Sequence, residues 1–67
     1  MEIESWGRRI RAFRKLKGFT QQRFAKEMGI SVSVLGEVER GSREPDEKML
    51  KKVTSVLNIT KQDLIQR

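Results

Sequence analysis

Turn-forming residues divide this chain into five short segments, and this division is the strongest limit on its fold. The breaks fall at Gly18, Gly29, Gly41, Pro45 and Asn58, residue types that commonly end or interrupt regular structure. Within each segment apolar residues recur at steps of three and four, the period of a helix, rather than in the alternation of a strand. A chain of 67 residues suits a single domain. We therefore expect an all-α fold of five helices, with residues 1–67 forming one domain.

The first segment predicts an amphipathic helix that ends near Gly18. Its apolar stripe consists of Ile3, Trp6, Ile10, Phe13 and Leu16. Basic side chains occupy the other flanks, as on a helix that packs one face against a core. Ser5 is one candidate for the residue that caps the helix start. We expect Trp6 in the core or at its edge; the alternative is a stacking platform for unpaired bases.

Two further helix starts each combine a capping side chain with a hydrophobic staple. Thr20 caps a helix over residues 21–28, and Ser31 caps one over residues 32–40. The staple pairs are Phe19 with Phe24 and Ile30 with Leu35. A connection of about three residues, 28–30, is too short to let the two helices run side by side. They must cross steeply, as in a helix-turn-helix.

The last two segments predict a longer helix and a short C-terminal one. The longer helix begins at Pro45 or Asp46, because Pro suits a first turn and acidic side chains suit the positive end of the helix dipole. It ends at Asn58, and its apolar stripe consists of Met49, Leu50, Val53, Val56 and Leu57. The short helix starts at Thr60, with Asp63 in the acidic position of a capping box.

The composition favours a polyanionic partner and leaves little chemistry for catalysis. Lys and Arg number 15 against 9 Asp and Glu, a formal net charge of +6. Residues 1–34 hold eight basic and three acidic side chains, whereas residues 35–67 hold seven and six, so the positive field belongs to the N-terminal half. With no Cys and no His, the chain lacks thiolate metal sites and the commonest general base. We assign no enzyme activity, catalytic residue, metal or cofactor.

Membrane and metal roles have weak support in the sequence. The longest apolar runs fall far short of the roughly 18 residues that a membrane span needs, and no signal peptide is recognisable. A cytoplasmic protein is the default expectation. Glu44, Asp46 and Glu47 cluster as metal ligands do, but their position at a helix start explains them without a metal.

Together these residues resemble the Cro and phage-repressor type of helix-turn-helix, the XRE family. The resemblance rests on Arg8-Arg9-Ile10-Arg11, Arg14 and Gly18, on Thr20-Gln21-Gln22 and Phe24-Ala25, on Gly29-Ile30-Ser31, on Leu35 and Val38-Glu39-Arg40-Gly41, and on Pro45, Leu50 and Leu57. It covers nearly the whole chain, and the order and spacing together make it specific. It implies a lambda-repressor-like fold of five helices with the helix-turn-helix at the second and third. The segment from Ser31 to about Arg40 would then lie in the major groove of double-stranded DNA.

The resemblance also implies roles for individual residues. Gln21, Ser42 and Arg43 would meet backbone phosphates. Arg14 and Glu39 would form a structural ion pair that joins the first helix to the third. The groove-facing residues would be Val32, Ser33, Gly36 and Glu37. A helical wheel agrees, since turning the apolar residues of the third helix inward leaves positions 33, 36, 37 and 40 outward at about 100° per residue.

These groove-facing side chains can make few contacts that distinguish one base from another. Val32 can touch only a thymine methyl, Ser33 is promiscuous, and Gly36 has no side chain. Glu37 is either an acceptor for a cytosine amino group or a solvated acid that repels phosphate, and both readings stay open. Gly36 would also cost an exposed helix about 1 kcal/mol relative to Ala. We expect modest specificity or a dependence on DNA shape.

The leading functional hypothesis is a transcriptional regulator that binds double-stranded DNA with a sequence preference. The rival is a protein-interaction module, either a coactivator bridge or an antitoxin-like partner, with weak non-specific DNA binding. Membrane-surface binding by the basic first helix is a third reading, which is weaker because the core needs that helix's apolar stripe. A homodimer on two half-sites and a protein partner are both compatible with the sequence, and a dimer would have to use the fourth and fifth helices.

Overall fold

Five helices in the predicted order make up the part of the chain that the structure describes. The structure is a computed structural model that describes residues 3–65, with side chains from residue 6 onward. The helices are α1 (Ile3–Leu16), α2 (Gln21–Met28), α3 (Val32–Arg40), α4 (Glu47–Leu57) and α5 (Lys61–Ile65). No strand occurs within residues 3–65, so the all-α prediction is confirmed. No helix in this range has the length and apolar character needed to cross a membrane.

The caps predicted for the second and third helices are confirmed. The Arg23 backbone N–H donates to Thr20 Oγ1 at 3.1 Å, and the Val34 backbone N–H donates to Ser31 Oγ at 3.1 Å. Each hydroxyl satisfies a donor that has no partner inside the helix. As a result α2 and α3 begin at the predicted residues, and they end as predicted before Gly29 and Gly41, which both have left-handed backbones.

The start of α4 differs from the prediction, whereas the start of α5 agrees with it. Asp46 has an extended backbone and accepts the Met49 backbone N–H at 2.8 Å, so it is the cap and the helix begins after it. The prediction that placed Pro45 in the first turn is therefore wrong, because Pro45 precedes the cap and is buried. At α5 the capping box is complete. The Thr60 N–H donates to Asp63 Oδ2 at 2.9 Å, and the Asp63 N–H donates to Thr60 Oγ1 at 3.1 Å.

α1 ends as predicted just before Gly18, whose φ is 84°, but it departs from the prediction at its start and at one residue of its apolar stripe. It begins at Ile3, so Ser5 lies inside the helix and is not its cap. The side chain of Ile3 lies outside the described residues. Leu16 is 76% exposed, so its assignment to the core stripe is wrong. The reason is angular: Leu16 lies about 120° around the helix from the fully buried Ile10, outside the arc that faces the core.

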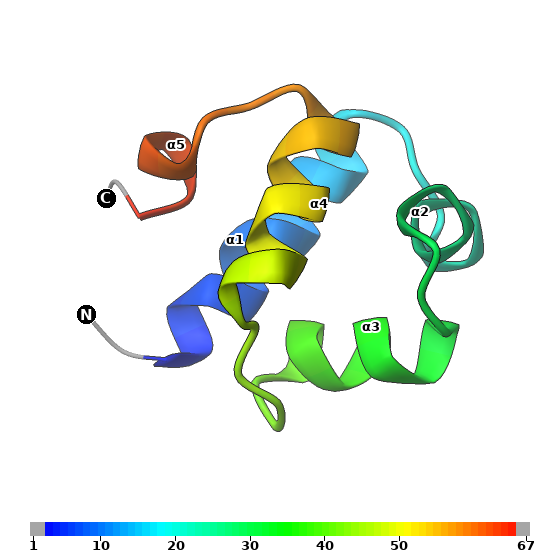
Figure 1. Cartoon of the computed structure of the whole chain (residues 1–67), viewed down its shortest axis with the longest axis horizontal. Helices are drawn as coiled ribbons and strands as arrows, with labels where there is room; N and C mark the ends of the chain where they lie inside the picture. The colour runs from blue at the N-terminus through cyan, green and yellow to red at the C-terminus, as the bar shows by residue number, and fades with distance from the viewer. Residues whose placement is uncertain (1–2, 66–67) are drawn as a thin grey trace.

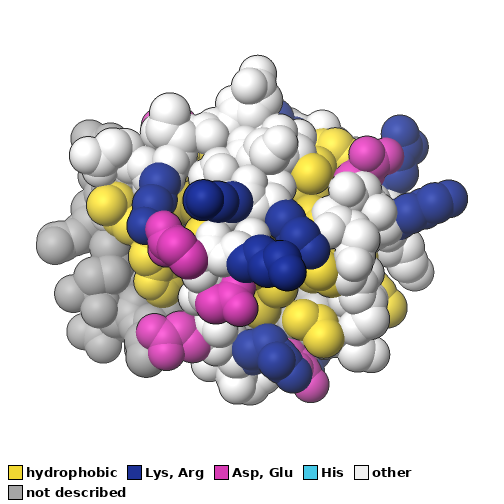
Figure 2. Space-filling view, viewed as in Figure 1, with side chains coloured by type: hydrophobic (Ala, Val, Ile, Leu, Met, Phe, Trp, Pro, Cys, Tyr) yellow, Lys and Arg dark blue, Asp and Glu magenta, His cyan; other side chains and the backbone are white. Residues whose placement is uncertain are grey.

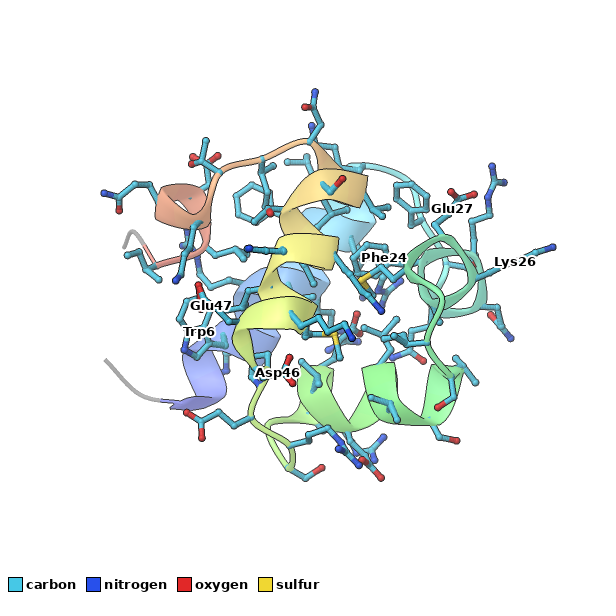
Figure 3. All side chains as sticks on the ribbon, viewed as in Figure 1. Trp6, Phe24, Lys26, Glu27, Asp46 and Glu47 are labelled. Atoms are coloured by element: carbon cyan, nitrogen blue, oxygen red, sulfur yellow. The ribbon has the colours of Figure 1, made fainter. Side chains whose placement is uncertain are left out.

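A single core gathers side chains from all five helices. α1 contacts α3, α4 and α5, and α2 contacts α3 and α4; in Figure 1, α4 crosses in front of α1 with α2 and α5 on opposite sides. The buried apolar residues are Ile10, Phe24, Ala25, Met28, Leu35, Val38, Leu50, Val53, Leu57 and Leu64, with Trp6, Phe13 and Phe19 packed against them in part. Figure 3 shows Phe24 directed from α2 toward the centre, whereas Lys26 points away. Trp6 therefore has the core-edge position expected of it.

Gly7 allows α1 and α3 to touch backbone to backbone. A Cβ at this position would lie 2.2 Å from the Val38 carbonyl oxygen and 2.8 Å from the Glu39 carbonyl oxygen. Contacts this short are not sterically allowed, so any larger residue would force the two helices apart. The close crossing brings the basic face of α1 within side-chain reach of α3.

Arg9 fastens α5 to α1. Its Nε donates to the Leu64 carbonyl at 3.1 Å, and its Nη2 donates to the Asp63 carbonyl. The guanidinium carbon also lies 5.7 Å from the centroid of the Phe13 ring, a cation–π arrangement. A helix of five residues has little stability of its own, so this side chain supplies part of what holds α5 in place.

Candidate nucleic-acid interface

α2 and α3 form a helix-turn-helix with a steep crossing. In Figure 1, α2 is seen nearly end-on while α3 lies across the view. The turn between them uses Gly29, whose φ of 72° is in the left-handed region that Cβ-bearing residues avoid. The Ile30 backbone N–H then returns to the Ala25 carbonyl at 3.0 Å. This turn fixes the outward face of α3 relative to the start of α2.

A buried ion pair ties this unit to α1. Arg14 Nε and Nη2 donate to the two carboxylate oxygens of Glu39 at 2.7 and 3.1 Å, and Arg14 Nη1 donates to the Phe19 carbonyl at 2.8 Å. The side chains of Arg14 and Glu39 are only 8% and 2% exposed. Gln21, expected at a phosphate, donates its side-chain amide to Glu39 Oε1 at 3.0 Å. The pair and Gln21 therefore hold α1, α2 and α3 in one arrangement.

A basic hollow of about 660 Å³ lies at the start of α2. It is lined by Arg11, Arg14, Thr20, Gln21, Gln22, Glu39 and Arg40. The first N–H groups of any α-helix lack partners within the helix and carry the positive end of its dipole, which suits an anion. Because Glu39 already neutralises Arg14, the charge available to an anion there comes from Arg11 and Arg40.

The outward face of α3 differs from the predicted one at a single position. Val32 is 41% exposed, Ser33 is exposed and Glu37 is half-buried. Gly36 is buried, so the expectation that it contributes exposed groove-facing surface is wrong. The reason is Arg40, one turn later, whose Nη1 lies 3.2 Å from the place that a Cβ on Gly36 would occupy. The guanidinium group covers the glycine and replaces it on the surface.

The loop after α3 is folded back onto Glu37. The Glu37 carbonyl accepts the backbone N–H groups of Ser42 and Arg43 at 2.9 and 3.3 Å, and the Ser42 hydroxyl at 3.2 Å. Its carboxylate pairs with Arg43, whose Nε lies 2.7 Å from Glu37 Oε1. The structure thus brings together a residue expected at base edges and a residue expected at a phosphate.

Two of the three acids that resembled metal ligands in the sequence, Asp46 and Glu47, have other partners. Asp46 caps α4, as described above, and Glu47 pairs with Lys61 of α5 at 2.6 Å; Figure 3 labels both acids near the start of α4. Within the described residues no group of three or more His, Cys, Asp or Glu side chains is arranged to hold a metal ion. Asp46 therefore stabilises the start of α4, and Glu47 stabilises the contact between α4 and α5.

Sequence reasoning missed three residues that shape this interface: Gly7, Arg11 and Arg40. Arg40 could have been predicted, since the helical wheel already placed it on the outward face of the third helix. Arg11 was one of eight basic residues among residues 1–34, with nothing to set it apart. Gly7 carries no local signal, because only the crossing partner makes its missing Cβ necessary.

Known proteins share both the sequence pattern and the fold of this chain. Residues 10–64 match the helix-turn-helix family HTH_3. The chain is 61% identical over 64 residues to YazB of Bacillus subtilis (strain 168), an uncharacterized HTH-type transcriptional regulator, and the match covers 96% of this chain and 93% of YazB. The restriction-modification controller protein C.AhdI from Aeromonas hydrophila has a TM-score of 0.89 at 32% identity, over 94% of this chain and 96% of that one.

The regulator SinR provides a third likeness. Its N-terminal DNA-binding domain from Bacillus subtilis has a TM-score of 0.86 at 31% identity, over 96% of this chain and 94% of that one. SinR has also been solved in complex with DNA, with a TM-score of 0.85 to this chain at 32% identity. The chain spans 54% of the full length of SinR. On the family match and these relatives, the chain belongs to the helix-turn-helix family of the Cro and phage-repressor type.

Proposed function

We propose that this chain is a transcriptional regulator that binds double-stranded DNA through its helix-turn-helix. The observation that carries the proposal is the position of the basic hollow at the start of α2, beside the outward face of α3. That arrangement lets one helix lie in the major groove while the other meets the flanking backbone. The DNA complex of SinR supports the same use of the fold. We propose a cytoplasmic location on the same grounds, and no catalytic role.

On the groove side, the proposal assigns Val32, Ser33 and Glu37 to the surface that faces base edges. Arg40 takes the place of Gly36 there, because it covers the glycine. On the backbone side, a phosphate would enter the hollow near Gln21, between Arg11 and Arg40. Phosphate contacts of this kind fix the orientation of a protein on DNA without carrying sequence information.

Ser42 fits a phosphate role less directly than Gln21 does. Its hydroxyl and its backbone N–H both donate to the Glu37 carbonyl, so a phosphate would have to compete for the hydroxyl. Gln21 keeps its backbone N–H at the first position of α2, directed away from the helix. We therefore propose the start of α2 as the principal phosphate contact and Ser42 as a secondary one.

The experiment that tests this function is selection of bound duplexes from a random DNA pool at near-physiological salt. An enriched motif is the expected result, and a two-fold symmetric motif would indicate a homodimer on two half-sites. Ser33→Ala should then change the preferred bases while the fold stays intact by circular dichroism. A pool that passes through without enrichment would overturn the proposal and favour the protein-interaction alternative.

A further inference from the structure

We infer that Arg43 reads a guanine in the major groove and that Glu37 is the residue that positions it. The inference rests on the proposed placement of α3 in the groove and deepens it. It differs from the phosphate role that the sequence implied for Arg43. It also replaces both earlier readings of Glu37, which becomes neither a cytosine acceptor nor a free acid.

The backbone anchors Arg43 to the recognition helix. Its N–H donates to the Glu37 carbonyl at 3.3 Å, and the preceding Ser42 N–H donates to the same carbonyl at 2.9 Å. The reversal that makes this possible occurs at Gly41, whose φ is 86°. The Arg43 side chain therefore starts from a point fixed against α3, rather than from a loop that moves independently of it.

The side-chain contact leaves the guanidinium ready for a guanine. Arg43 Nε lies 2.7 Å from Glu37 Oε1, so this donor is used inside the protein. Within the part of the chain that the structure describes, neither Nη group has a hydrogen-bond partner, and the spacing of the two groups in the planar guanidinium fork matches the O6 and N7 acceptors of guanine. The Glu37 carboxylate thus orients the fork, and the positive charge of Arg43 offsets the repulsion between this carboxylate and nearby phosphates.

The other residues on the outward face of α3 discriminate poorly between bases, so a marked preference for one base requires a side chain such as Arg43. Val32 offers an apolar contact, and Ser33 accepts or donates without discrimination. Arg40 is shared with the basic hollow at the start of α2. Arg43 is 52% exposed and Glu37 39% exposed, so the pair contributes little to folding and can be removed without unfolding the domain.

The test is duplex selection with the wild-type chain and four variants: Arg43→Ala, Arg43→Lys, Glu37→Gln and the control Glu27→Gln. Glu27 pairs with Arg23 on the exposed face of α2, at 3.5 Å, so the control makes the same charge change away from α3. The wild-type motif should contain a guanine preferred on the order of tenfold to a hundredfold. Arg43→Ala should lose this preference and keep the others. Arg43→Lys and Glu37→Gln should weaken it at the same position, and Glu27→Gln should leave it unchanged.

The double variant Glu37→Gln with Arg43→Ala distinguishes positioning from direct contact. If Glu37 acts through Arg43, the double variant will have the same motif as Arg43→Ala alone. Additional changes at a different base would overturn the positioning role. A wild-type motif that survives Arg43→Ala unaltered, with affinity lowered equally for all sequences, would overturn the inference and leave the proposed function standing. Failure of the wild-type chain to enrich any motif would overturn both.

Discussion

The carboxylate of Glu39 is nearly inaccessible to water and accepts hydrogen bonds from Arg14 of α1 and Gln21 of α2. Removing one charge of such a pair leaves the other buried without compensation, which typically costs about 3–5 kcal/mol. Arg14→Met and Glu39→Met should each lower the free energy of unfolding by about 3 kcal/mol. Urea denaturation followed by circular dichroism measures the loss. For a domain of this size, that is a large share of the total stability.

The double variant Arg14→Met with Glu39→Met provides the control. Because it leaves no unpaired charge, its free energy of unfolding should fall by clearly less than the sum of the two single losses. Additive losses would show that the two side chains stabilise the domain independently, and would contradict a structural ion pair.

At the residue scale, the sequence indicated the partners of capping side chains within one helical turn, but few of the partners that lie on different elements. The resemblance implied the contact between Arg14 and Glu39. It did not give the bond from Gln21 to Glu39 or the pairing of Glu37 with Arg43. Partners on different helices or across a turn depend on the path of the backbone and on rotamers, which a linear pattern does not record.

At the element scale, two glycines inside helices should respond oppositely to the same substitution. Gly7→Ala places a Cβ against the backbone carbonyls of α3, so it should destabilise the domain by about 2 kcal/mol or more. Gly36→Ala meets only the mobile end of Arg40, at 3.2 Å, so the higher helix propensity of Ala should leave stability equal or raise it by up to about 1 kcal/mol. Thermal unfolding of both variants provides the comparison.

The affinity for DNA provides a second measurement on the Gly36→Ala variant. Gly36→Ala should shift Arg40 and alter affinity for DNA although the domain stays folded. A Gly7→Ala variant as stable as the wild-type chain would show that the backbones of α1 and α3 do not touch at this position.

α5 should be sensitive to acid through its capping box. The Thr60 backbone N–H and hydroxyl, with a smaller contribution from the charges of Arg9 and Lys17, hold the pKa of Asp63 below its ordinary value of 3.8. A lowered pKa in the folded state means that the carboxylate stabilises the fold above about pH 3.8, and that this contribution is lost as the pH falls through the folded value. Asp63→Asn should therefore be less stable than wild type near neutral pH, and the difference should vanish in acid.

An NMR titration of the Asp63 carboxyl carbon checks the direction of the shift. A midpoint at or above 3.8 would contradict the capping role. Lys61→Ala is the matched control for Asp63→Asn, because it removes the exposed pair with Glu47 at the same helix and leaves the capping box intact. The Asp63 pKa should stay below its ordinary value in this variant.

The ends of α2 and α3 were the most predictable part of this fold, because their causes are local. The caps at Thr20 and Ser31 act within three residues, so the sequence contains both donor and acceptor. Leu16 could not be placed in the same way. An apolar residue at helical spacing is buried only if a neighbouring helix covers its face, and the packing of α1 leaves that face open.

At the scale of the whole molecule, some of the basic side chains of residues 1–34 bind other parts of the protein, and others remain on the surface where an anion can reach them. Arg9 is committed to α5 and Arg14 to Glu39, so neither is free to meet an anion. Arg11 lines the hollow at the start of α2. The face that α4 presents is different: Figure 2 shows cationic and anionic side chains intermingled there. Net charge therefore indicated the class of partner, but only the fold shows which cations can reach it.

This division predicts which arginine contributes to the salt dependence of DNA binding. Each phosphate neutralised by a cation releases counterions, so losing one such contact reduces the slope of log affinity against log salt by about 1. Arg11→Ala should show this reduction for specific and random duplexes alike. Lys51→Ala removes the same charge from an exposed position on α4, outside the hollow, and should leave the slope unchanged. Fluorescence anisotropy over a salt series measures both. Equal slopes for Arg11→Ala and the wild-type chain would place the phosphate elsewhere, whereas a reduced slope for Lys51→Ala would mean that DNA also contacts α4.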